Sequence, residues 1–90
     1  MKAHDVKTNP TDHDAFGHPA YDSAVLNAVR RARENQGACF TVYFDGESIF
    51  VRASEAAPPP DSKKICIAER WNDTTVQVRF DGARSEWFYF

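Results

Sequence analysis

Residues 74–90 read TTVQVRFDGARSEWFYF, two alternating runs joined by a turn signal and ending in four consecutive aromatic residues. In the first run, apolar side chains at positions 76, 78 and 80 alternate with polar ones at 75, 77 and 79. This period of two is typical of a β-strand with one apolar face. Asp81-Gly82 then favours a two-residue hairpin turn. The segment therefore predicts a hairpin whose second strand carries the aromatic residues.

The hairpin decides which face of the sheet each aromatic residue occupies. A two-residue turn would place Val76 opposite Trp87, so Trp87 and Tyr89 would share the apolar face of the first strand. Phe88 and Phe90 would then point to the opposite face, because side chains alternate along a strand. A one-residue bulge would exchange the two pairs. In either case aromatic side chains lie on both faces.

A helix is predicted before the strands, from about residue 20 to residue 36. Apolar side chains recur there at spacings of three and four, with Pro19 at the start and Gly37 at the expected C-cap. Three arginines lie near its end. The helix is expected to cover one face of the sheet with its apolar side chains, which are Tyr21, Val25, Leu26 and Val29.

Further strands are predicted at residues 38–44, 48–53 and 63–71, where aromatic and β-branched residues dominate. Three prolines interrupt the pattern between the last two strands, which predicts a stiff connecting loop rather than a polyproline ligand. The fold class is thus α+β, with one N-terminal helix on a five-stranded antiparallel meander that could curl into a small barrel. Residues 1–18 are expected to form a flexible polar tail, and residues 19–90 a single domain.

This order of one helix and five antiparallel strands is similar, in topology alone, to that of the Sm-like and SH3-like small barrels. The sequence departs from the Sm-like pattern, because it lacks the glycine and asparagine positions that an Sm-type RNA pocket requires. The resemblance therefore implies no RNA-binding residue, and such small barrels serve many functions.

Charge and hydropathy exclude several classes of protein. The chain has 11 Lys and Arg against 13 Asp and Glu, a net charge of −2, which weighs against a protein that binds duplex nucleic acid through its phosphates. No apolar run approaches the length of a membrane span, and no secretory signal precedes the domain. Cys39 and Cys66 lack a CxxC partner and are expected to be inert thiols. These features predict a cytoplasmic location.

No motif for catalysis is present. The sequence contains no GxSxG, GxGxxG or GxxxxGK[ST] segment, and all three histidines fall within the first 18 residues. We therefore expect no enzymatic activity and no cofactor. The N-terminal segment does hold side chains of metal-ligand type, but their spacing matches no ordered module, and no metal site is predicted. These side chains are His4, Asp5, Asp12, His13, Asp14 and His18.

One helix can cover only one face of such a sheet. The aromatic pair on the other face is therefore expected to contact another molecule. The sequence thus predicts a non-enzymatic interaction module, such as a regulator, inhibitor or accessory subunit, that forms a homodimer or docks on a larger protein. An alternative is single-stranded nucleic-acid binding through sheet aromatics and helix arginines. For the arginines, a solvated helix face with an Arg30–Glu34 pair is the simpler interpretation. The predicted contact residues are Phe88, Tyr89, Phe90, Arg30, Arg31 and Arg33.

Overall fold

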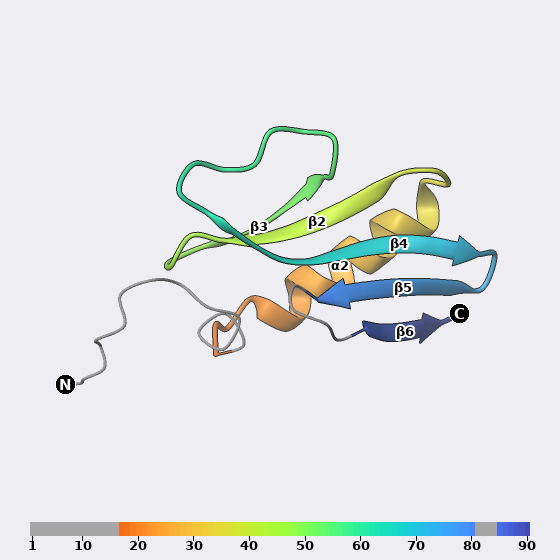
Figure 1. The fold of residues 1–90 in the computed structure, drawn as a ribbon. Helices are drawn as coiled ribbons and strands as arrows, with labels where there is room; N and C mark the ends of the chain where they lie inside the picture. The colour runs from red at the N-terminus through yellow and green to blue at the C-terminus, as the bar shows by residue number, and fades with distance from the viewer. Residues whose placement is uncertain (1–16, 81–84) are drawn as a thin grey trace.

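The computed structural model describes residues 17–80 and 85–90, and shows one helix followed by five strands (Figure 1). The expected tail, except its last two residues, and the predicted turn at Asp81-Gly82 lie outside the described residues. The elements are α2 (Tyr21–Glu34), β2 (Cys39–Phe44), β3 (Ile49–Ala53), β4 (Lys63–Asn72), β5 (Thr75–Phe80) and β6 (Ser85–Tyr89).

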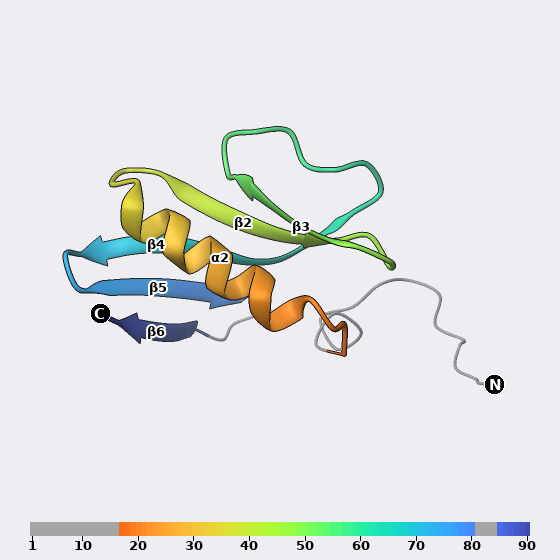
Figure 2. The ribbon, with the colours of Figure 1, turned by 180° about the vertical axis from the view of Figure 1, so that it is seen from behind.

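The five strands form one antiparallel sheet in the order β3-β2-β4-β5-β6. Helix α2 packs on one side of this sheet, called the helix face below, and the other side is called the far face (Figure 2). The predicted fold class, one helix on five antiparallel strands, is confirmed. The sheet is open rather than closed into a barrel, so β3 and β6 are its two edges.

The strand order departs from a simple meander because β3 pairs on the outer side of β2. Strands β3 and β4 are then parallel, and residues 54–62 must return along the length of the sheet. This proline-rich loop arches over the β3 end of the sheet (Figure 1). It is held at its start by Thr41, whose Oγ1 lies 2.7 Å from Oγ of Ser54. Pro59 is buried and anchors the loop, whereas Pro58 and Pro60 are exposed.

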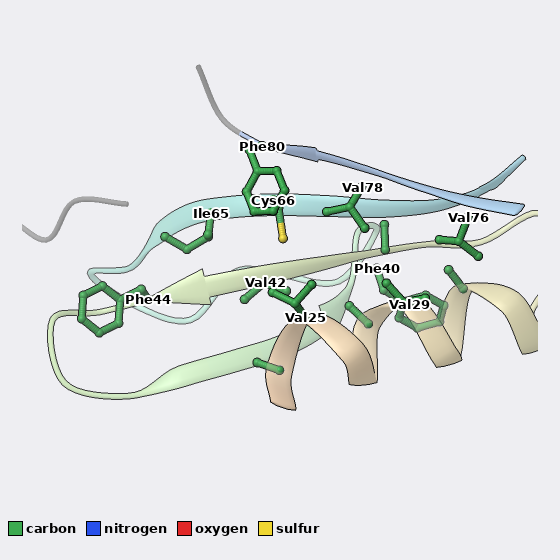
Figure 3. Close-up of a cluster of buried hydrophobic side chains, with 14 residues drawn as sticks. Val25, Val29, Phe40, Val42, Phe44, Ile65, Cys66, Val76, Val78 and Phe80 are labelled. Atoms are coloured by element: carbon green, nitrogen blue, oxygen red, sulfur yellow. The ribbon is translucent and has the colours of Figure 1, made fainter. Parts of the chain in front are cut away.

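The core fills the space between α2 and the sheet. Figure 3 shows Val25 and Val29 of α2 pointing toward the strands. Alanines at the closest approach let the helix lie near the sheet, because a methyl group occupies little space. The completely buried core residues are Ala28, Ala32, Val42, Ile65, Ala68, Val76 and Val78. Since α2 packs on β2, β3, β4 and β5, strand β6 lies beside the helix rather than beneath it (Figure 2).

The ends of α2 are fixed by short hydrogen bonds. Before the helix, Nδ1 of His18 accepts from the backbone N–H of Ala20 at 2.9 Å, and Nε2 lies 2.8 Å from the carbonyl oxygen of Glu47. The histidine ring thus links the helix start to the β2–β3 hairpin. At the other end Asn35 is the C-cap, and Gly37 turns the chain into β2 with a φ of 88°.

Candidate interaction surface at the C-terminal strand

The register between β5 and β6 determines where the C-terminal aromatic residues lie. Val76 pairs with Phe88, Val78 with Glu86, and Arg79 with Ser85. Each residue of β5 thus pairs one position further along β6 than a two-residue turn would allow. The predicted pairing of Val76 with Trp87 was therefore wrong, and the alternative in which the two aromatic pairs are exchanged is the observed one. Because one extra residue reverses every side chain, Phe88 lies on the helix face, while Trp87 and Tyr89 lie on the far face.

On the helix face, Phe88 is half-buried and packs against the core. Phe90 follows it on the same side and stays 47% exposed. The guanidinium carbon of Arg33 lies 4.3 Å from the centre of the Phe90 ring. This distance is that of a cation–π contact, which ties the last residue to α2.

On the far face, Trp71 and Trp87 are stacked, with ring centres 5.8 Å apart and ring planes inclined by 21°. Trp71 comes from the end of β4 and Trp87 from β6, so β5 passes between their backbones. Trp71 is 62% exposed, Trp87 40% and Tyr89 75%. Three large aromatic side chains therefore stand in solvent at one corner of the sheet, which is unusual for a small monomer.

The three arginines do not form one patch. Arg30 and Arg33 line a shallow hollow of about 190 Å³ together with Phe88 and Phe90. Arg31 turns the other way, with its guanidinium carbon 4.7 Å from the centre of the Phe40 ring. The expected Arg30–Glu34 ion pair is not formed, and within residues 17–80 and 85–90 Arg30 makes no ion pair.

A second hollow of about 480 Å³ adjoins the first, because Leu26 and Phe88 line both. The two hollows form a groove between α2 and β6. Leu26 was expected to cover the sheet, but it stands on the rim of this groove and is 49% exposed. Glu86 lies in the second hollow together with Tyr21.

The hydrogen bonds of β6 show which of its backbone groups face outward. The N–H of Phe90 donates to the carbonyl oxygen of Thr74 at 2.8 Å. Since bonded and non-bonded pairs alternate in an antiparallel ladder, Phe88 and Glu86 also bond to β5. The backbone groups of Ser85, Trp87 and Tyr89 consequently point away from the sheet. Among the described residues no strand pairs with this side of β6.

Sequence reasoning left Trp71 undecided between the core and the rim, assigned Leu26 to the covered face of the sheet, and did not single out Glu86. The pairing of β4 with β5 shifts register between Arg70 and Asn72, so simple alternation along β4 does not fix the side of Trp71. Leu26 lies about 100° round the helix axis from the core residue Val25, which places it at the edge of the covered face. No local signal identifies Glu86, since its position depends on the register of the hairpin.

The two cysteines lie in different surroundings. Partial burial raises the pKa of the Cys39 thiol; the Glu69 carboxylate raises it further, and Arg79 opposes both. A nucleophilic thiolate is disfavoured by this setting. Cys66 is buried on the helix face, opposite to Cys39, so the two sulfur atoms cannot be joined. No three His, Cys, Asp or Glu side chains gather as metal ligands in the described part of the chain.

No protein-family model, curated protein or solved structure matches this chain. Within the described ranges, no helix has the length and apolar character needed to cross a membrane.

Proposed function

We propose that the protein is a small non-enzymatic interaction module that binds a protein partner along the outer edge of β6. The single observation that carries this proposal is the combination of an open strand edge with exposed aromatic side chains at the same corner. Natural proteins usually blunt such edges with lysine, proline or a covering loop. Strand β6 contains no lysine and no proline, whereas the β3 end of the sheet carries the proline-rich loop (Figure 1).

An added strand would satisfy the outward backbone groups of Ser85, Trp87 and Tyr89. Main-chain hydrogen bonds provide affinity in this mode of recognition, and flanking side chains provide specificity. Tyrosine and tryptophan are enriched at such contacts because they offer a large apolar area with a polar group. The groove between α2 and β6 adds Leu26 and Phe88 to the surface that a partner can cover.

The proposed setting is the cytoplasm. Neither cysteine can form a disulfide with the other, because they lie on opposite faces of the sheet. A reducing compartment suits such a pair of thiols.

The proposal is tested by isolating the tagged chain from cells with its bound proteins. We expect Tyr89→Pro to lose the partner, because proline removes the outward N–H of residue 89 while the bonds of Phe88 to β5 and of Phe90 to Thr74 remain. The matched control is Tyr89→Ala, which removes the side chain but keeps the N–H. Equal retention of the same proteins by wild type and Tyr89→Pro contradicts the proposal.

Single-stranded nucleic acid is the second candidate, and the exposed stack of Trp71 and Trp87 on the far face favours it. Bases stack on such aromatic platforms. Among the described residues, Arg79 is a cation on that face, and it is engaged, because its Nη1 lies 2.6 Å from Oε1 of Glu69. Titration with labelled oligonucleotides at two salt concentrations tests this candidate. Phosphate contacts require binding to weaken as salt rises.

A further inference from the structure

We infer that the partner at the β6 edge is the β6 edge of a second copy of this chain, paired antiparallel about a two-fold axis at Trp87. This inference rests on the proposed function and names its partner. A two-fold axis brings the same surface of each copy together, so β6 must pair with an identical strand that runs in the opposite direction. Each side chain must therefore fit the side chain that lies opposite it in the second copy. The edge of β6 meets this requirement in one register.

Only outward-facing residues of the two strands can bond to each other, which restricts the possible registers. Pairing Ser85 with Trp87 of the second copy would set Glu86 directly against Glu86, and like charges opposite each other are destabilising. Pairing Trp87 with Tyr89 of the second copy leaves Ser85 without a partner in the other β6. Pairing Trp87 with Trp87 places Ser85 opposite Tyr89 and engages all five residues of β6.

On the far face, this register continues the row of aromatic side chains. Trp71 already stacks on Trp87, and the axis adds the same pair from the second copy. Tyr89 lies across from the small side chain of Ser85, which leaves room for its ring. Trp87 and Tyr89 thereby gain neighbours from the second copy, while Trp71 stays stacked against Trp87 on the side away from the axis.

On the helix face, the register brings opposite charges together. Glu86 of the second copy lies across from Phe88, and Arg30 lines the hollow above Phe88. Arg30 is exposed and makes no ion pair within the described ranges. The axis repeats this arrangement, so one carboxylate meets one guanidinium on each side. Charge complementarity of this kind favours a second copy over an unrelated acidic or basic strand.

Sedimentation equilibrium of the purified chain tests the inference first. We expect a dimer at micromolar concentration, and a dissociation constant at least ten times higher for Tyr89→Pro than for Tyr89→Ala. The proline removes one interstrand donor from each copy, hence two hydrogen bonds per dimer. Urea unfolding of both variants verifies that each is still folded. A monomer at high micromolar concentration, or a dimer that Tyr89→Pro leaves intact, overturns the inference.

The register is tested in a dimer mixed from isotope-labelled and unlabelled copies. Residues 86 and 88 form a non-hydrogen-bonded pair across the axis, so their Cα atoms approach to about 4.5 Å. We therefore expect an intermolecular contact between Hα of Glu86 and Hα of Phe88 in a filtered NOE spectrum. A contact between two Phe88 residues, or between two Glu86 residues, overturns the register.

These results separate the inference from the proposed function. If the pure chain is monomeric but Tyr89→Pro still loses a protein from cells, the partner is not a second copy and the edge still binds. If the chain is monomeric and Tyr89→Pro keeps every bound protein, both statements fail.

Discussion

Trp87 and Phe88 are neighbours in the sequence, yet they have different roles. Phe88 packs against the core beneath the groove, whereas Trp87 stacks on Trp71 in solvent. The difference follows from the register of one hairpin, because residues next to each other on a strand point to opposite faces.

Alanine substitutions at these two positions measure this difference. We expect Phe88→Ala to lower the free energy of unfolding by about 2 kcal/mol, below the range of about 3–5 for a completely buried phenylalanine. Trp87→Ala should cost about 1 kcal/mol, the value of an aromatic pair. Urea denaturation of a dilute sample gives both values. A larger loss for Trp87→Ala would indicate that Trp87, not Phe88, lies on the helix face.

Asp45 makes the free energy of unfolding depend on pH in the acidic range. Its Oδ1 accepts hydrogen bonds from the backbone N–H groups of Glu47 and Ser48, at 2.9 and 2.7 Å. These bonds favour the ionised carboxylate and hold its pKa below the ordinary value of 3.8. The ionised form thus stabilises the folded protein above that value, and this contribution is lost as pH falls through the lower pKa of the folded state.

We expect Asp45→Asn to flatten the acid side of the stability curve, since the amide oxygen keeps an acceptor but does not titrate. The measurement is the midpoint of urea unfolding at pH 7 and at successive values below 4. Glu47→Gln removes another carboxylate from the same hairpin and serves as the control. An unchanged acid slope in Asp45→Asn contradicts the role given to this carboxylate.

At the scale of elements, the helix and all five strands could be predicted from sequence periodicity. Helix α2 was placed within two residues of each end. The position of β3 outside β2 could not be predicted, because it depends on where residues 54–62 pack after the strand ends. The faces of Trp87 and Phe88 also could not be predicted, because they depend on the register of the β5–β6 hairpin. A shift of one residue exchanges the two faces. The aromatic corner was thus predictable, but its division between the two faces was not.

His18 joins two elements that are distant in the sequence. Its ring accepts from Ala20 at the start of α2 and bonds to Glu47 in the β2–β3 hairpin. It also meets the ring of Phe44 edge-on, with centres 5.9 Å apart.

We expect His18→Ala to lower the free energy of unfolding by about 1–2 kcal/mol, the sum of two partly exposed hydrogen bonds. Thermal or urea unfolding at pH 7.5 measures this loss. Asn35→Ala, which removes a side-chain hydrogen bond at the other end of α2, is the matched control. No loss in His18→Ala would mean that the histidine link adds nothing to stability.

At the scale of the whole molecule, the described residues form a sheet that α2 covers on one face and whose two edges differ. The β3 end carries the proline-rich loop, and the β6 edge carries exposed aromatic side chains (Figure 1). A chain of this size buries only about 60% of its unfolded surface, so the association that we propose at the β6 edge would also add stability.

Charge reversal at Arg30 tests the helix side of this association. Arg30→Glu sets a carboxylate near Glu86 of the second copy, and we expect the dimer to weaken at least several-fold, most strongly at low salt. The stability of the monomer should change little, because the side chain is exposed. Arg52→Glu makes the same charge change on β3 and is the control. Equal effects of the two variants contradict the charge arrangement.

The most direct measurement is hydrogen exchange of the β6 amides as the protein concentration rises. The amides of Glu86 and Phe88 bond to β5 and that of Phe90 bonds to Thr74, so all three should be protected at every concentration. The outward amides of Ser85, Trp87 and Tyr89 should exchange freely when dilute and gain protection together from low to high micromolar concentration. Outward amides that exchange freely at every concentration would contradict pairing of two copies along β6.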